Sequence, residues 1–265
     1  MDFGKKMGRN ALVRLGAHLS GPREGRRIVA FHEIRDGGLF RKRMEWLRAA
    51  FEVVPLHELI HRPPDADAAV ALTFDDGYGV FHELVAPVLA DLGLPATFFV
   101  CSGFVGLTGS AAAAYARRCL QRVDAPRPLT HAELADLACT PGFEIGSHTV
   151  HHLDVGRRWD RAVLRAEIDG DRDRLADWTG RAVRLFAYPF GERGTVSEQV
   201  SAHVRASGFD AAVTCVPGFV TAGGDPFLTP RDGLDETDPL ALWRAWLQGG
   251  YDRLYAWTSR LALAG

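Results

Sequence analysis

The regular alternation of short apolar runs with longer segments of helical periodicity constrains this chain more than any other feature. The apolar runs have the length of buried strands and lie at residues 27–31, 70–74, 96–101, 143–146, 185–188 and 211–215. Helical patterns lie between them at residues 41–51, 80–92, 130–137, 161–179 and 195–207. This order predicts a parallel α/β sheet, with helices on both faces of an open sheet or around the outside of a closed one.

The length of the chain favours a single domain. It has 265 residues, a size at which α/β barrels commonly form one domain of about seven or eight units. Periodicity alone does not separate a barrel from an open sheet. We expect loops at residues 63–65 and 106–114, and a closing helix or helix pair at residues 239–257. Several aromatic residues of this last segment are expected to pack against the barrel, with stacking on a sugar as the alternative: Trp243, Trp246, Tyr251, Tyr255 and Trp257.

Charge and cysteine usage exclude several classes of protein. The formal net charge is −2, so no global basic field attracts nucleic acid. The four cysteines lie far apart without CxxC spacing, which indicates neither a disulfide framework nor a thiolate zinc site. No unbroken apolar stretch has the length of a transmembrane span or of a secretory signal, so we expect a cytoplasmic protein.

A basic extension at residues 1–27 precedes the domain, which we place at residues 28–265 with the helical segment at its end. The extension carries seven basic and two acidic side chains. We interpret it as a solvated segment, and peripheral contact of a basic helix with an anionic membrane is the alternative. The sequence does not indicate an oligomeric state.

Two polar clusters directly follow predicted strands, where both α/β layouts place active sites. Asp75-Asp76-Gly77 follows the strand at residues 70–74. This tripeptide is typical of a turn, but it also offers one carboxylate as a metal ligand and another as a base. His148, His151 and His152 follow the strand at residues 143–146. Histidines three or four residues apart can share one metal ion, so His148 pairs with either of the other two.

These two clusters predict a metal site suited to hydrolysis. Asp76 and two of the histidines would form a three-ligand site with an open position, as catalytic zinc requires. Neutral imidazole suits zinc and other transition metals. A metal bound in this way acidifies a water molecule and polarises a carbonyl group, which serves amide hydrolysis.

A third cluster, Tyr188-Pro189-Phe190-Gly191, follows the strand at residues 185–188. Proline and glycine predict an irregular turn. Its aromatic side chains can line a pocket and its backbone amides can hold an oxyanion. A hydrophobic loop that packs on the core is the alternative.

Together the three clusters resemble the polysaccharide deacetylase family, carbohydrate esterase family four. The signature of that family is Thr-Phe-Asp-Asp-Gly, then His-Ser/Thr-x-x-His, then a Pro-aromatic-Gly loop, which this chain matches at residues 73–77, 148–152 and 188–191. Phe31-His32 and Pro230-Arg231 resemble features of the branch that modifies exopolysaccharides. The resemblance covers roughly residues 28–235.

The resemblance implies a distorted parallel (β/α) barrel, often of seven strands. It also implies a metal, usually zinc with cobalt or nickel sometimes substituting, and a set of three ligands: Asp76, His148 and His152. Asp75 would be the general base that takes a proton from the attacking water. The backbone N–H of Phe190 would help to stabilise the oxyanion, in the loop that contains Tyr188 and Pro189.

The chain departs from the family pattern at the residue that orients the base. The family often has an arginine ahead of the Pro-aromatic-Gly loop, and Ala187 stands at that position here. Arg184, Arg193 or Arg231 can substitute. We choose Arg231 because it lies in the late Pro-Arg pair, and a purely structural ion pair is the alternative.

A second departure concerns the general acid. The family often supplies a late histidine that protonates the leaving amine, and no histidine follows His203 in this chain. We expect His32, just after the first strand, to take this role, with a structural histidine as the alternative.

These observations lead to one main hypothesis and two alternatives. We expect a metal-dependent deacetylase that removes the N-acetyl group from an N-acetylhexosamine unit of a glycan or glycan precursor, so that its partner is a carbohydrate. The first alternative is a hydrolase of a non-sugar amide, such as a ureide or a formamide. The second is a catalytically impaired carbohydrate-binding module that retains the metal.

Overall fold

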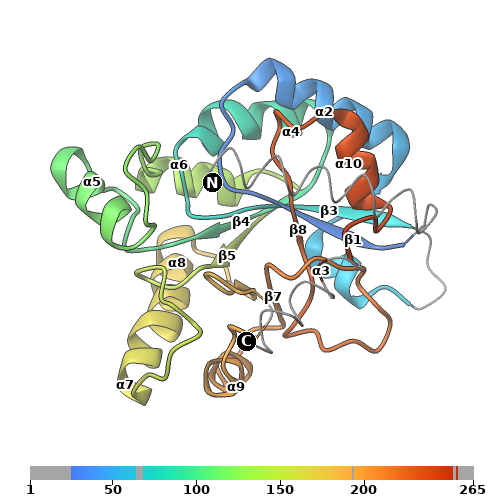
Figure 1. Cartoon of the computed structure of the whole chain (residues 1–265). Coiled ribbons are helices and arrows are strands. Elements are labelled where there is room, and N and C mark those ends of the chain that lie inside the picture. Colours follow the sequence, from blue (N-terminus) through green and yellow to red (C-terminus); the bar gives the residue numbers. More distant parts are fainter. Residues whose placement is uncertain (1–24, 64–67, 193, 253–254, 256–265) are drawn as a thin grey trace.

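A computed structural model describes residues 25–63, 68–192, 194–252 and 255 of the chain (Figure 1). Its strands are β1 Arg27–Phe31, β2 Glu52–Val53, β3 Ala69–Phe74, β4 Ala96–Val100, β5 Phe143–Ser147, β6 Leu185–Ala187, β7 Ala211–Val213 and β8 Asp232–Gly233. Its α-helices are α2 Gly37–Ala50, α3 Leu56–His61, α4 Ala86–Leu92, α5 Gly109–Arg118, α6 His131–Cys139, α7 Arg161–Leu164, α8 Gly170–Thr179, α9 Glu198–Ala206 and α10 Leu240–Leu247. Two π-helical turns are η1 Phe81–Val85 and η2 Arg165–Asp169.

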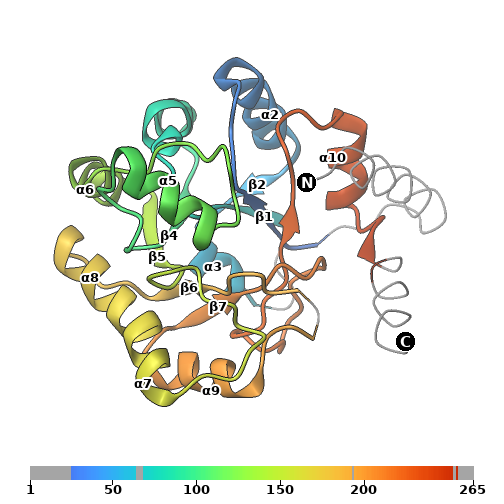
Figure 2. The same cartoon turned by 60° about the vertical axis from the view of Figure 1, so that its left-hand side comes forward.

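The strands form one parallel sheet that curls into a distorted barrel. Their order is β7-β6-β5-β4-β3-β1-β8, and β2 pairs with β3 outside this path. All of these pairings are parallel, as expected where helices cross over between successive strands. Figure 2 shows α2, α6, α8 and α9 around the outside of the strands. The expected distorted (β/α) barrel, a single domain with seven strands along its path, is confirmed.

The segment at residues 229–234 bridges the two ends of the sheet. Thr229 forms a parallel bridge with Val213 of β7, and its N–H donates to the carbonyl of Ala212 at 3.1 Å. A few residues later β8 pairs with β1, and the N–H of Leu234 donates to the carbonyl of Ala30 at 3.1 Å. We call this segment the seam. Its Asp-Gly strand is too short and too polar to give a periodic signal, so the sequence did not reveal it.

Alternation along the strands separates an outer core from the barrel interior. In β3, Val70, Leu72 and Phe74 belong to the larger cluster, which is packed with the helices, whereas Ala69 and Ala71 belong to the interior cluster. Small side chains suit the narrow interior of a barrel. Because the side-chain period of a strand is two, Thr73 and Asp75 continue the interior row. Asp75 is thereby directed into the barrel.

Capping residues set the helix boundaries more closely than periodicity did. α2 begins at residue 37 instead of 41, because the side chain of Asp36 accepts a hydrogen bond from Leu39 N–H at 2.9 Å. α9 begins at residue 198 instead of 195, because Ser197 caps it. A capping box formed by Thr130 and Glu133 is present at the start of α6, where the sequence predicted a helix from residue 130.

The helices expected at residues 80–92 and 161–179 each contain a π-helical turn. Pro87 in the first turn of α4 has no N–H to donate, which fits the wider turn η1 directly before it. In the second helix, η2 lies between α7 and α8. This helix ends at Gly180, which adopts a left-handed φ of 66° as a helix C-cap.

Two expectations about less regular segments need correction. Residues 106–114 were expected to form a loop, but α5 begins at Gly109, because the following alanines favour helix strongly. α10 covers only residues 240–247 of the closing segment expected at 239–257, and Gly249 follows it with a φ of 80°. The N–H of Tyr255 donates to the carbonyl of Tyr251 at 2.9 Å. Trp257 lies outside the described residues.

Most of the expected basic extension, residues 1–24, also lies outside the described part of the chain. Its last two basic residues, Arg26 and Arg27, are buried and not solvated. Arg26 donates to the carbonyl of Arg62 at 2.7 Å, and Arg27 pairs with Asp232 of β8 at 2.9 Å. Among the helices of the described residues, none combines the length and the apolar character that crossing a bilayer requires.

Candidate functional site

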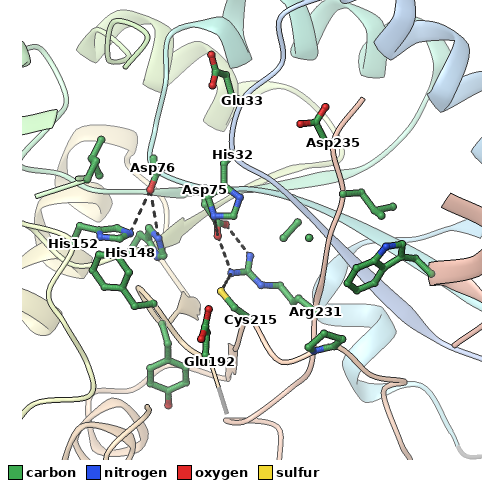
Figure 3. Close-up of a pocket in the computed structure, with 18 of the residues that line it drawn as sticks. His32, Glu33, Asp75, Asp76, His148, His152, Glu192, Cys215, Arg231 and Asp235 are labelled. Carbon is green, nitrogen blue, oxygen red and sulfur yellow. Dashed lines mark hydrogen bonds and ion pairs between the residues drawn. The ribbon is translucent and has the colours of Figure 1, made fainter. Parts of the chain in front are cut away.

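The three clusters singled out in the sequence meet at the carboxyl end of the barrel. A cavity of about 530 Å³ opens there, and it is lined by side chains that follow β1, β3, β5 and β6 and by the seam. Figure 3 shows how the polar side chains gather in this cavity. Parallel strands place their carboxyl ends at one edge of a barrel, so residues distant in sequence converge here.

Asp76, His148 and His152 form a group that can hold one metal ion. Nε2 of His148 lies 3.7 Å from Oδ1 of Asp76, and Nε2 of His152 lies 3.6 Å from the same oxygen (Figure 3). One ligand atom from each residue lies within 4.8 Å of the other two. Tetrahedral ligands at about 2.0–2.2 Å from zinc stand roughly 3.3–3.6 Å apart, so a small inward movement completes the geometry.

The surroundings of this group fit a cation. Oδ1 of Asp76 is buried and has no hydrogen-bond partner among the described residues. A buried carboxylate oxygen is costly unless a cation or a donor compensates it. His151, the alternative partner of His148, is exposed, and its Nδ1 lies 2.7 Å from Glu167 Oε1. The structure therefore brings His152, and not His151, to the metal group.

Both histidines of the group are held in the form that binds metals. Burial lowers the pKa of His148 against the opposing charges of Asp75 and Asp76, and burial lowers the pKa of His152 to about 4. Neutral imidazole is the ligand form. Nδ1 of His148 lies 2.7 Å from the carbonyl oxygen of Ala187, which can only accept, so Nδ1 carries the proton and Nε2 keeps its lone pair.

Backbone strain is concentrated at this site. The described non-glycine residues with positive φ are Asp76, Gln121, Thr149, His152 and Phe190, and all except Gln121 belong to the three clusters. A left-handed conformation costs a non-glycine residue free energy and persists where the surroundings impose it. The side chains of Asp76 and His152 are thus directed by turns that the sequence pattern does not favour locally.

Asp75 is fully buried and fully paired. Its two oxygens accept hydrogen bonds from the two terminal nitrogens of Arg231, each at 2.8 Å (Figure 3). Burial raises the pKa of Asp75, but the charge of Arg231 and these hydrogen bonds outweigh burial and hold the pKa well below its usual range. Each carboxylate oxygen keeps a second lone pair, so the group can still accept a proton from a water molecule in the cavity.

The arginine that contacts the base is the one chosen from the sequence. Arg231 lies in the seam, and its guanidinium also donates to the carbonyl of Thr214 at 2.9 Å and to the hydroxyl of Thr73 at 3.0 Å. Arg184 instead pairs with Asp210 near the surface. Arg193 lies outside the described residues. The buried ion pair also ties the seam to β3, a contact that both the orienting hypothesis and the structural alternative require.

His32 lies on the other side of Asp75, at the end of β1. Its Nε2 is 3.7 Å from Oδ2 of Asp75, and its side chain is 47% exposed (Figure 3). The N–H of Asp75 donates to the carbonyl of Phe31 at 2.9 Å, which fixes the two strand ends against each other. His32 is accessible from the cavity and close to the candidate base, which is the placement that a proton donor needs.

The residues of the loop after β6 differ in how they lie relative to the cavity. The ring of Phe190 lies edge-on against His152, with ring centroids 4.4 Å apart, and Phe190 lines the cavity. Tyr188 borders the same cavity, but its ring is fully buried and contacts Phe186. Pro189 is buried and is not part of the cavity wall.

Sequence reasoning did not find two carboxylates that hold the histidine turn. Glu167 of η2 accepts hydrogen bonds from the N–H of His151, and Asp171 of α8 accepts one from the N–H of His148. Burial raises the pKa of Asp171 to about 6, and hydrogen bonds from Ser102, among others, oppose this shift. Neither carboxylate stood out in the sequence, because acidic side chains are ordinary on the polar face of a helix.

The aromatic segment after β8 forms another part of the cavity wall. Three of its residues line the cavity: Trp246, Tyr251 and Tyr255. The rings of Trp246 and Tyr251 lie 4.4 Å apart. Packing on the barrel was expected for this segment, and it is confirmed for Trp243 and Trp246, which are buried in the main core, and for Tyr251, which packs against that core. A rim of paired charges completes the wall, in which Glu33 joins Arg35 and Arg122.

Comparison with known proteins agrees with this site. A sequence model described as polysaccharide deacetylase matches residues 62–212, which is more than half of the chain. YxkH of Bacillus subtilis, a curated protein whose name refers to the same family, is 22% identical over 203 residues. That alignment covers 72% of this chain, and the chain spans about 64% of the length of YxkH.

Solved structures share the fold at low sequence identity. IcaB from Ammonifex degensii is 20% identical with a TM-score of 0.65, covering 86% of this chain and 98% of its own. BC0361, a polysaccharide deacetylase from Bacillus cereus, is 19% identical with a TM-score of 0.67, covering 84% and 69%. The BpsB deacetylase domain from Bordetella bronchiseptica is 20% identical with a TM-score of 0.64, covering 79% and 95%. With the family signature matched over more than half of its length, the chain belongs to the polysaccharide deacetylase family.

Proposed function

We propose that the protein is a metal-dependent deacetylase that hydrolyses the N-acetyl group of an N-acetylhexosamine unit in a glycan or glycan precursor. One observation carries this proposal. A buried, unpartnered oxygen of Asp76 faces two neutral imidazoles, directly beside a second carboxylate that an arginine holds in place. This is the donor set of a catalytic metal centre next to a base.

Zinc is the metal that best suits two imidazoles and one carboxylate, with cobalt or nickel as alternatives. When bound, such an ion polarises the amide carbonyl and lowers the pKa of a water molecule. Asp76, His148 and His152 would hold it at the edge of the cavity. Ala187 fixes the tautomer of His148 through its carbonyl oxygen, so the ligand atom is ready before the ion arrives.

Asp75 is the general base in this proposal. Its free lone pairs take a proton from the water whose oxygen attacks the acetyl carbonyl carbon. Arg231 keeps the carboxylate ionised and fixes its orientation through two parallel hydrogen bonds. The low pKa of Asp75 makes it a weak base, so its contribution depends on its position beside a water that has already been acidified.

His32 and Phe190 complete the reaction. The backbone N–H of Phe190 stabilises the oxyanion that forms on the acetyl oxygen. His32 gives a proton to the sugar nitrogen as the carbon–nitrogen bond breaks, so that acetate and a free amine are released. Its exposed imidazole reaches the cavity, and its distance of 3.7 Å from Asp75 allows the proton to pass between the two groups through a water.

The aromatic wall supports a carbohydrate as the substrate. Flat aromatic faces bind the apolar faces of sugar rings, and the partly exposed Tyr251, packed on the buried Trp246, borders the same cavity as the metal group. A ureide or formamide substrate would not need this wall.

The test is acetate release by the purified protein after chelator treatment and reconstitution with zinc, cobalt or nickel. Oligosaccharides and nucleotide-linked forms of N-acetylhexosamines serve as substrates beside a ureide and a formamide. Acetate release that depends on added metal supports the proposal. Hydrolysis of only the ureide or the formamide would favour a non-sugar amidase. Metal and glycan binding with no turnover of any substrate would identify a catalytically impaired binding module.

A further inference from the structure

The helix formed by α7, η2 and α8 is hydrogen-bonded to the turn that carries both proposed histidine ligands. From η2, the carbonyl of Glu167 accepts the N–H of Val150 at 3.0 Å, and its side chain accepts the N–H of His151 at 2.8 Å. From α8, one helical turn later, Asp171 reaches the start of the same turn. The π-helical turn η2 lies where these contacts begin, and such turns frequently occur at functional sites.

Asp171 is the most deeply buried member of this arrangement. Its side chain has no solvent exposure, and both of its oxygens accept hydrogen bonds. Oδ1 accepts the N–H of Ser102 at 2.7 Å, directly after β4. Oδ2 accepts the hydroxyl of Ser147 at 2.6 Å and the N–H of His148 at 3.1 Å, at the end of β5. One carboxylate thereby joins α8 to the ends of two strands, and one of its three donors is the backbone of a metal ligand.

We propose that Asp171 is a positioning residue for the metal centre, which fixes the backbone of His148 and thereby sets the affinity of the site for its ion. This inference rests on the proposed function, because it assumes that the Asp76–His148–His152 group holds a metal. Asp171 does not contact the ion or the substrate. It acts through the main-chain N–H of His148, so a substitution of the His148 side chain would not reproduce its effect.

The reason lies in the strain of the turn. Thr149 and His152 both adopt positive φ, at 65° and 52°, so the turn from His148 to His152 relaxes unless its ends are fixed. Each relaxed conformation separates Nε2 of His148 from Nε2 of His152. Hydrogen bonds that orient ligands from outside typically contribute about 10–100-fold to metal affinity. Asp171 fixes the N–H of His148, the first residue of the turn, and Glu167 fixes the N–H groups of Val150 and His151.

The same helix provides a matched control. Asp169 lies two residues before Asp171 and also has a hydrogen-bonded carboxylate, but its partners are Ser207 and His203 of the neighbouring α9 region. Asp169→Asn therefore perturbs the packing of this helix without touching the histidine turn. Asp171→Asn keeps the shape of the side chain but places an amide NH₂ where a second acceptor is required.

The experiment measures cobalt binding to metal-free protein at 25 °C, through the visible absorption of the bound ion and by zinc competition. We expect Asp171→Asn to weaken the Kd for cobalt by about 10–100-fold and to lower kcat at saturating metal, with KM for substrate within about twofold of wild type. Asp169→Asn should lower the thermal midpoint without changing the cobalt Kd or the absorption spectrum. Equal weakening by both variants, or no weakening by Asp171→Asn, overturns the inference.

A second variant decides the question if Asp171→Asn does not fold. Ser147→Ala removes one of the three donors and leaves the hydrogen bonds from Ser102 and His148, so we expect a folded protein with a cobalt Kd weakened several-fold. An unchanged Kd in Ser147→Ala then overturns the inference. If the wild-type protein itself binds no cobalt or zinc, the proposed function fails, and this inference fails with it. Unchanged binding in the variants beside tight wild-type binding removes only the role of Asp171.

Discussion

Two regions of the molecule line the same cavity but are positioned by different features. One carries the proposed histidine ligands, and the other is the seam, which carries Arg231. The metal group is built from the ends of β3 and β5, which lie on either side of β4 in the sheet, and its residues come from two short motifs. The seam supplies an arginine that is separated by 156 residues from the carboxylate that it binds. The proposed ligands are thus specified by local patterns, whereas the environment of the proposed base depends on how the barrel closes. The following predictions test whether the two regions are separable, from the largest expected effect to the smallest.

His148→Ala should abolish both metal binding and activity. It removes one of three ligands and leaves the unpartnered oxygen of Asp76 without a second imidazole on that side. Metal content after dialysis and acetate release measure the two effects. His151→Ala is the matched control, because His151 lies in the same turn but is directed to Glu167, and it should keep both properties. Retained metal in His148→Ala would contradict the ligand assignment.

Asp75→Asn should lower kcat by about 10²–10⁴-fold, the usual range for loss of a general base, while metal remains bound. The amide keeps the shape of the carboxylate but cannot take the proton. Acetate release and metal content are again measured together. Turnover near the wild-type rate would show that Asp75 is not the base, and loss of metal would show that the seam and the ligand region are not separable.

Arg231→Ala should lower the free energy of unfolding by about 3–5 kcal/mol, because it leaves the buried charge of Asp75 without its partner. Chemical denaturation measures this change. Arg184→Ala is the control, since the exposed pair of Arg184 with Asp210 is expected to contribute less than about 1 kcal/mol. A loss of similar size in both variants would mean that closure of the barrel does not depend on the contact between Arg231 and Asp75.

His32→Ala should lower kcat by about 10²-fold, at the lower end of the range for acid–base groups, because water can reach this half-exposed position. Metal content and KM should stay unchanged. Single-turnover rates of acetate release give the comparison. An unchanged rate would leave His32 as a structural histidine and would require another donor for the leaving amine.

The effect that is smallest near neutral pH is a pH dependence in the ligand region. The pKa of His152 is about 4 in the folded, metal-free protein and about 6.5 in an unfolded chain, so the unfolded state takes up the proton first as pH falls. The stabilisation is fully present above pH 6.5 and is lost toward pH 4, by at most about 1.4 kcal/mol per pH unit. The measurement is the difference in unfolding free energy between wild type and His152→Gln. This difference should shrink as pH falls over that window, and a constant difference would refute the shift.

Much of the fold was predictable because each strand and helix leaves its own periodic signal. The strands at residues 27–31, 70–74 and 96–101 agree with β1, β3 and β4 to within one residue. Segments with weak or conflicting signals were the ones that failed. The alanine-rich α5 was expected to be a loop because glycines surround it, and β8 was missed because two residues cannot display a period.

The sequence by itself determined which side chains are the candidates for the chemistry. The two aspartates, the spaced histidines and the loop after β6 are local patterns, and strand alternation alone directs Asp75 into the barrel. Only the tertiary structure decided that His152 and not His151 joins His148, that Arg231 binds Asp75, and that Asp171 holds the turn. These contacts depend on left-handed turns and on the closure of the sheet, whose free energies come from residues far apart along the chain.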